Sequence, residues 1–266
     1  MRKTCYTDSI QFNVRMCRLN GGRIVGRFYF GRSDMRRLKG YLTYFSWVEW
    51  LLWGVSSLAI CTAFMCFDRS NILTLIASLI GVTALIFYAK GNPIGHALMI
   101  VFCIIYAVIS YTCAYYGEML TYLCMALPMT VIGLVTWCKN PFEKGKAEVQ
   151  VHRVKPKEYL LMIILAVIVS IIFYFVLKAL NTANLIVSTL SVATSFIPAY
   201  LTFRRSAYYA LGYAFNDVVL VVLWIMQSLQ NASYVAVAVC FTAFLANDLY
   251  GFVSWLKMQK RQQKDA

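Results

Sequence analysis

The hydrophobic residues of this chain fall into long uninterrupted runs that are separated by short polar segments. Between about residue 45 and residue 256, the apolar residues neither alternate with polar ones, as in a half-buried strand, nor recur every three to four residues, as in an amphipathic helix. An apolar run of about 18 or more residues is long enough to cross the hydrocarbon core of a bilayer as a helix. The pattern therefore predicts eight membrane spans, over residues 45–67, 71–89, 94–115, 118–137, 159–178, 183–203, 206–228 and 233–256.

The composition agrees with an all-α polytopic membrane protein. The chain is 61% hydrophobic and 14% charged, whereas a soluble domain has about 25% charged residues. The polar segments are too short to bury a second, soluble core. Nine cysteines occur, mostly inside the runs and never as C-x-x-C, which favours small buried side chains over a metal or redox site. The sequence predicts no metal site and no cofactor.

The basic residues give the direction of the chain. A net charge of +14 is typical of nucleic-acid binding, but these residues lie between and outside the apolar runs. With both termini cytoplasmic, 23 of the 25 Lys and Arg residues fall on the inner side, as the positive-inside rule requires. This predicts a multi-pass protein of the cell membrane that binds no nucleic acid. Within the basic N-terminal segment, Ser33 and Asp34 could cap a short helix on the cytoplasmic membrane surface, with a topology anchor as the simpler interpretation.

An internal repeat organises the spans. Residues 71–82 resemble residues 181–192 at an offset of 110, and residues 133–137 resemble residues 251–255 at an offset of 118. The copies are separated by four spans, so they run in the same direction, related by a pseudo-twofold axis along the membrane normal. The predicted organisation is a basic cytoplasmic segment (1–44), an extra transmembrane helix (45–67), a first three-helix bundle (71–137), a basic cytoplasmic loop (138–158), a linker helix (159–180), a second three-helix bundle (183–256) and a cytoplasmic tail (257–266).

Two acidic residues, Asp217 and Asp248, lie near the middle of predicted spans, and each follows an asparagine, Asn216 or Asn247. An ionised Asp at the bilayer centre costs about 3 kcal/mol unless it faces a cavity or a partner. No Lys or Arg occurs at this depth. We therefore expect both Asn-Asp pairs to face one polar chamber. The alternative is a hydrogen-bonded helix pair without a ligand.

Further candidates share a helix face with Asp217. Tyr213 precedes it by four residues, Trp224 follows by seven, and Gln227 lies three beyond Trp224, so all project from roughly one side. Trp224 could stack on a flat ring, and ordinary packing is the alternative. Tyr106 is the counterpart of Trp224 in the first repeat.

The first repeat offers few polar groups at the same depth. The offset of 118 aligns Met99 with Asp217 and Thr130 with Asp248. The chamber is therefore predicted to be polar on the side of the second repeat and mainly aromatic and apolar on the side of the first.

The residues that carry this pattern also resemble a known family. Residues 213–224 and 247–255 closely resemble the last two helices of the PnuC family of nicotinamide riboside transporters, and residues 106–111 and 127–129 resemble its first half. The similarity covers about residues 71–257. It implies a SWEET-like core of two three-helix bundles and a linker helix. It also implies facilitated diffusion of the vitamin, which a separate cytoplasmic ribosylnicotinamide kinase traps.

The resemblance assigns a substrate site without catalysis. The substrate-binding residues predicted from the pattern and the resemblance together are Tyr106, Ser110, Tyr213, Asn216, Asp217, Trp224, Gln227, Asn247, Asp248 and Tyr250. The segment 92–96 departs from the family pattern, and related transporters carry thiamine or riboflavin, so another vitamin is an alternative. A proton-coupled carrier that uses Asp217 or Asp248 is a second alternative. The expected partners are the vitamin and membrane lipids, and a homo-oligomer is left open.

Overall fold

The computed structural model describes residues 14–18, 24–28, 44–69, 71–112, 116–182 and 185–265. Two compact units divide the chain, Met1–Trp50 and Leu51–Ala266. In the first unit, strands β1 (Val14–Arg18) and β2 (Ile24–Phe28) form an antiparallel pair, which the sequence analysis did not predict. The proposed cap at Ser33 and Asp34 lies outside the described residues.

Eight helices of the described chain are long and apolar enough to cross a membrane, which confirms the predicted all-α polytopic class. The fourth is continuous through three segments, and the eighth starts with a single 3-10 turn, η2. Their bounds are α2 (Trp47–Phe67), α3 (Ile72–Ala89), α4 (Ile94–Thr112), α5 (Tyr116–Leu120) with η1 (Thr121–Ala126) and α6 (Leu127–Lys139), α7 (Pro156–Ala179), α8 (Leu185–Phe203), α9 (Tyr209–Ser228), and η2 (Ala232–Tyr234) with α10 (Val235–Lys264).

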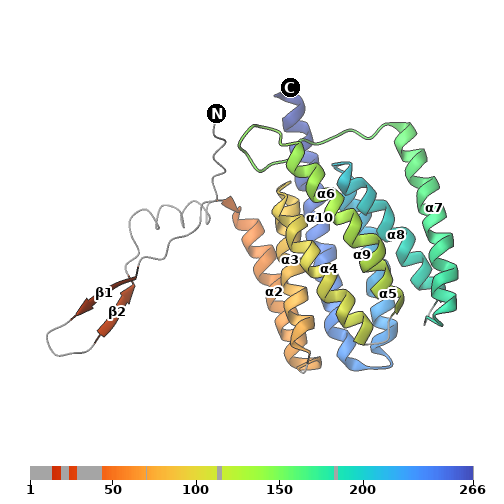
Figure 1. Ribbon diagram of the computed structural model, residues 1–266, viewed down its shortest axis with the longest axis horizontal. Coiled ribbons are helices and arrows are strands. Elements are labelled where there is room, and N and C mark those ends of the chain that lie inside the picture. The colour runs from red at the N-terminus through yellow and green to blue at the C-terminus, as the bar shows by residue number, and fades with distance from the viewer. Residues whose placement is uncertain are drawn as a thin grey trace. The chain divides into compact units, whose positions relative to one another are not determined.

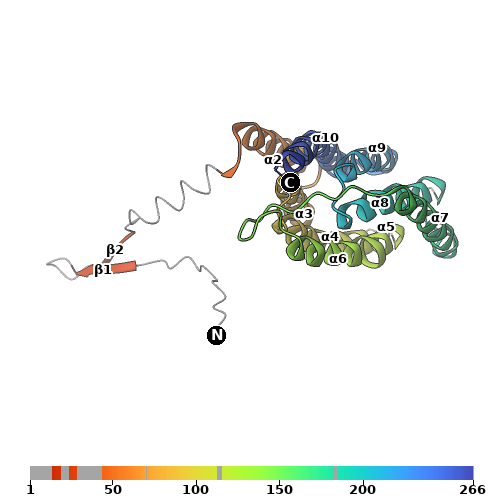
Figure 2. The ribbon, with the colours of Figure 1, turned by 90° about the horizontal axis from the view of Figure 1, so that it is seen from above.

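The helices of the second unit form two groups, which Figures 1 and 2 show from the side and from above. The first group is α3, α4 and the α5–η1–α6 helix, and the second is α8, α9 and α10. The groups meet twice, where α3 packs on α10 and where α6 packs on α8. In each case the first helix of one group meets the third helix of the other. α7 packs against α8 at the edge. This order is compatible with the predicted 3+1+3 repeat.

The ends of α3 and α8 add a structural match to the repeat. Gly91 and Arg205, which follow these helices, both have a positive φ, of 64° and 58°. The N–H of Gly91 donates to the carbonyl of Tyr88 at 2.9 Å, and the N–H of Arg205 donates to the carbonyl of Thr202 at 2.9 Å. The offset is 114 for both pairs, between the two offsets found in the sequence. The left-handed backbone conformation costs a residue with a side chain about 1 kcal/mol or more. Arg205 adopts it nevertheless, so both halves share the same turn although only the first has glycine there.

The segment 140–155, here called the strap, joins α6 to α7 across one end of the two groups (Figure 1). The N–H of Val149 donates to the carbonyl of Gly91, and the N–H of His152 donates to the carbonyl of Arg205, both at 3.0 Å. The side chain of Gln262, on the last turns of α10, donates to the carbonyl of Val149 at 3.0 Å. The strap is therefore bonded to equivalent positions in both groups. We call this end of the molecule the basic face, since it carries Lys90, Lys139, Arg204, Arg205 and Arg261.

An ion pair joins the start of α7, directly after the strap, to the residue that follows α8. The guanidinium of Arg204 donates to the carboxylate of Glu158 at the start of α7. His152 lies beside both, with its Nε2 3.5 Å from the Glu158 carboxylate. Burial, followed by the charges of Arg204 and Arg205, lowers the pKa of His152, so its imidazole is neutral near pH 7.

Candidate functional site

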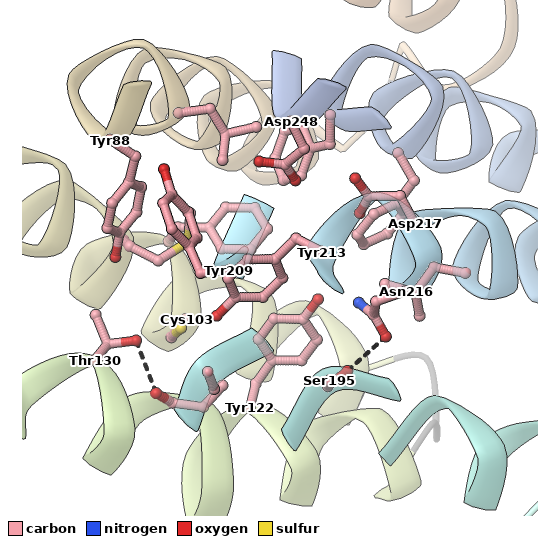
Figure 3. Close-up of a pocket in the computed structure, with 18 of the residues that line it drawn as sticks. Tyr88, Cys103, Tyr122, Thr130, Ser195, Tyr209, Tyr213, Asn216, Asp217 and Asp248 are labelled. Atoms are coloured by element: carbon pink, nitrogen blue, oxygen red, sulfur yellow. Dashed lines mark hydrogen bonds between the residues drawn. The ribbon is translucent and has the colours of Figure 1, made fainter. Parts of the chain in front are cut away.

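A cavity lies between the two helix groups, and its empty space, counted with its opening, is about 690 Å³. Its walls combine aromatic rings, small polar groups and two carboxyl groups, and Figure 3 shows most of them. The lining residues are Leu85, Tyr88, Met99, Phe102, Cys103, Thr121, Tyr122, Ala126, Thr130, Ser195, Ala199, Tyr209, Tyr213, Asn216, Asp217, Leu220, Phe241, Phe244 and Asp248.

The two intramembrane acids both line this cavity. Asp217 is 3% exposed and Asp248 is 4% exposed, and Figure 3 shows them side by side, from α9 and α10. The Oδ2 atom of Asp217 has no hydrogen-bond partner among the described residues. No Lys or Arg belongs to the lining. Because a buried carboxylate needs a partner to offset its desolvation, this side of the cavity favours a cationic ligand.

The two asparagines of the Asn-Asp pairs have different positions. Asn216 lines the cavity, and its Oδ1 accepts hydrogen bonds from the hydroxyls of Thr194 at 2.9 Å and Ser195 at 2.8 Å. These bonds leave the amide NH₂ of Asn216 for the cavity (Figure 3). Asn247 is outside the lining, and its amide donates to Ser56 of α2 at 3.0 Å. Successive helical residues are about 100° apart, so Asn247 points away while Asp248 points in.

The cavity contains several tyrosines that the sequence analysis did not assign to the site. Tyr213 was predicted, and Tyr88, Tyr122 and Tyr209 join it in the lining. Tyr209 lies four residues before Tyr213, so its helical spacing could have indicated it. Tyr88 and Tyr122 belong to the first group, where no acidic residue lies near the middle of a predicted span.

The asymmetry of the two repeats is visible in the lining. Met99 and Thr130, which the repeat aligns with Asp217 and Asp248, both lie in the wall. Both carboxyl groups and the amide of Asn216 come from the second group. The first group contributes mainly aromatic and apolar side chains, together with the hydroxyls of Thr121 and Thr130.

The remaining predicted residues lie outside the lining. Tyr106 and Trp224 are each one turn farther from the basic face than the lining residues Phe102 and Leu220. Their rings meet edge-on, with centroids 6.2 Å apart and planes at 84°. Two repeat-related residues therefore pair beyond the far end of the cavity. Ser110, Gln227 and the half-buried Tyr250 are also outside the lining.

The helix wall beside the cavity is irregular. Thr121–Ala126 form a π-helical segment, η1, and Pro128 follows two residues after its end. Proline lacks the N–H that an α-helix uses at that point, and short π segments are frequent at functional sites. The wider turn places Thr121, Tyr122 and Ala126 in the cavity wall.

Comparison with known proteins agrees with the fold and the site. A family model described as nicotinamide mononucleotide transporter matches residues 71–257. The chain is 26% identical over 231 residues to the nicotinamide riboside transporter PnuC of Neisseria mucosa, which covers 85% of this chain and 86% of that protein. It is 23% identical over 190 residues to the protein of the same name from Haemophilus influenzae, covering 71% and 81%.

A solved structure supports the same assignment at the level of the fold. The crystal structure of the vitamin B3 transporter PnuC superposes with a TM-score of 0.72 at 20% identity, covering 82% of this chain and 94% of that one. The family model accounts for well over half of the chain and includes both intramembrane acids. The chain belongs to the nicotinamide mononucleotide transporter family, whose members are transporters and not enzymes.

Proposed function

We propose that this protein carries nicotinamide riboside across the cell membrane through the cavity between its two helix groups. The observation that carries the proposal is the pair of buried carboxyl groups, Asp217 and Asp248, in an aromatic cavity without a basic residue. Relatives that cover most of the chain are named for this vitamin.

The chemistry of the ligand suits the wall. Nicotinamide riboside joins a positively charged pyridinium ring to a ribose. Asp217 and Asp248 supply negative charge for the ring, and the amide of Asn216 can donate to a ribose hydroxyl. Aromatic faces attract a cation by about 0.5–2 kcal/mol, so Tyr122 and Tyr213 suit the same ring. A neutral vitamin would gain no charge attraction from the two acids.

The mode of transport in this proposal is facilitated diffusion. The basic face is cytoplasmic by the positive-inside rule, which also places both termini inside. The exposed apolar side of α7 faces lipid. A separate ribosylnicotinamide kinase then phosphorylates the vitamin on the cytoplasmic side, and the added charge prevents its return.

The first prediction separates facilitated diffusion from proton coupling. Purified protein in liposomes should take up nicotinamide riboside at the same initial rate with and without an inward proton gradient, because at zero membrane potential a carrier without a coupled ion responds only to the substrate gradient. The measurement is uptake of labelled vitamin at equal internal and external pH, compared with a more acidic exterior at zero membrane potential. Uptake that accelerates with the gradient would favour proton transfer by the acid pair instead.

The second prediction concerns Trp224. Its replacement by Ala should weaken binding of nicotinamide riboside at least about tenfold, the equivalent of about 1.4 kcal/mol. The indole closes the far end of the cavity with Tyr106, and buried aromatic contacts contribute on this scale. Calorimetry on detergent-purified protein would compare nicotinamide riboside with thiamine and riboflavin. Trp53→Ala is the control, because Trp53 lies on α2 with its indole bonded to Thr83.

Each result of that calorimetry has a definite meaning. If wild-type protein binds another vitamin and not nicotinamide riboside, the proposed fold stands and the proposed substrate is wrong. If wild type and Trp224→Ala bind nicotinamide riboside with equal affinity, Trp224 does not contribute to the binding site.

A further inference from the structure

Two tryptophans lie side by side between the cavity and the basic face. Trp137 of α6 is 1% exposed and Trp255 of α10 is 0% exposed. Their ring centroids are 5.3 Å apart, with planes inclined by 46°. The two residues are related by the repeat offset of 118, so their contact falls where the two helix groups meet.

Each tryptophan is hydrogen-bonded to the opposite group. The indole N–H of Trp137 donates to the carbonyl of Thr202 on α8 at 2.9 Å. The indole N–H of Trp255 donates to the carbonyl of Tyr88 on α3 at 2.7 Å. Thr202 and Tyr88 are equivalent in the repeat, because their carbonyls accept the matching turn hydrogen bonds from Arg205 and Gly91. The arrangement is therefore a reciprocal exchange, in which one group's third helix is tied to the other group's first helix at both interfaces.

This pair closes one end of the cavity. Tyr88 and Tyr209 line the cavity, and the tryptophans pack edge-on against them. The ring centroids are 5.5 Å apart for Tyr88 and Trp137, and 4.9 Å apart for Tyr209 and Trp255. The carbonyl of Tyr88 also accepts the N–H of Gly91, and Gly91 in turn accepts from Val149 of the strap. Aromatic rings, turns and strap thus form successive layers between the cavity and the basic face.

We propose that Trp137, Trp255 and their two cross-bonds, together the tryptophan latch, are the gate that opens the cavity toward the basic face. The inference rests on the proposed transport through this cavity. For a ligand to leave on this side, α6 must part from α8 or α10 must part from α3, and either motion breaks an indole bond. The buried rings exclude water while the latch is closed. The strap is bonded to both groups beside the latch, so it limits how far they separate.

The test removes the bonds and keeps the rings. Trp137→Phe and Trp255→Phe delete one indole N–H each while a buried aromatic ring remains. Cys103 is the reporter, since it lines the cavity, in a background where the other cysteines are serine. A membrane-impermeant maleimide is applied separately to each side of oriented vesicles. We expect each variant to raise labelling from the basic face by about twofold to tenfold, the population shift that loss of one net hydrogen bond gives. Labelling from the opposite face should not rise.

The control matches the chemical change at another site. Trp53→Phe also removes an indole N–H from a hydrogen bond, to the hydroxyl of Thr83 at 3.1 Å, and it should leave Cys103 labelling at the wild-type level. Labelling that stays constant in both latch variants would overturn the proposal, and so would labelling that rises equally from both faces. The two single variants act on separate interfaces, so either one tests the latch if the other does not fold. No vitamin enters this experiment, so its outcome is independent of the substrate assignment.

Discussion

Replacing Asp217 by Asn should weaken binding of nicotinamide riboside by about tenfold to hundredfold. The substitution keeps the size of the side chain and removes the ionisable carboxyl group from a site that is 3% exposed. Hydrogen bonds and ion pairs to a buried charged group contribute about 1.5–3 kcal/mol, which corresponds to this range of affinity. Asp248→Asn should have an effect of the same order, because both carboxyl groups line the same wall. Calorimetry on purified variants measures both.

Two controls make this result specific to charge in the cavity. Asp265→Asn removes the same charge from an exposed position at the end of α10 and should leave affinity unchanged. The reduced, uncharged form of nicotinamide riboside should lose much less affinity than the cationic form when Asp217 is replaced. Equal losses for the two forms would mean that the acids act through shape or hydration and not through their charge.

The fold could be predicted because a bilayer limits the solutions. Every backbone polar group in lipid must be bonded internally, so eight long apolar runs permit eight helices and little else. The charge asymmetry and the repeat then favoured one arrangement. The two strands in the N-terminal unit were missed, because residues 14–18 and 24–28 are short and lie in a strongly basic segment. The direction of the termini remains a prediction of the positive-inside rule.

The site could be predicted only where polarity is unusual for a membrane. Asp217 and Asp248 stand out in apolar runs, and both lie in the cavity. Asn247 was grouped with them by sequence adjacency, but the 100° step of a helix turns it toward α2. Tyr88 and Tyr122 carry no signal of this kind, because tyrosines are common throughout these spans. Their positions depend on how α3 and the π-helical segment pack, which a single sequence does not reveal.

The second large effect that we expect is a loss of stability when Gly133, which packs against His96, is replaced by alanine. Gly133→Ala should lower the free energy of unfolding by about 1–3 kcal/mol, the usual cost of an overpacked core. A Cβ at this position would lie 2.3 Å from Cε1 of His96. That ring cannot move aside, since its Nδ1 is 2.8 Å from the hydroxyl of Tyr88 and it packs edge-on against Trp137, with centroids 4.5 Å apart. Thermal unfolding of detergent-purified protein should show a lower midpoint.

The repeat supplies a matched control for this substitution. Gly251 is the counterpart of Gly133 at the offset of 118, but its nearest neighbour for a Cβ is the methyl group of Ala210, at 3.6 Å. Gly251→Ala should therefore be tolerated or slightly stabilising, because alanine is favoured over glycine by about 0.5–1 kcal/mol within a helix. In a His96→Ala background, Gly133→Ala should lose its cost for the same reason. Two results would contradict this explanation. One is a loss of stability from Gly133→Ala that persists in the His96→Ala background, and the other is an equal loss from Gly251→Ala. Either result would mean that contact with His96 is not the reason why position 133 requires glycine.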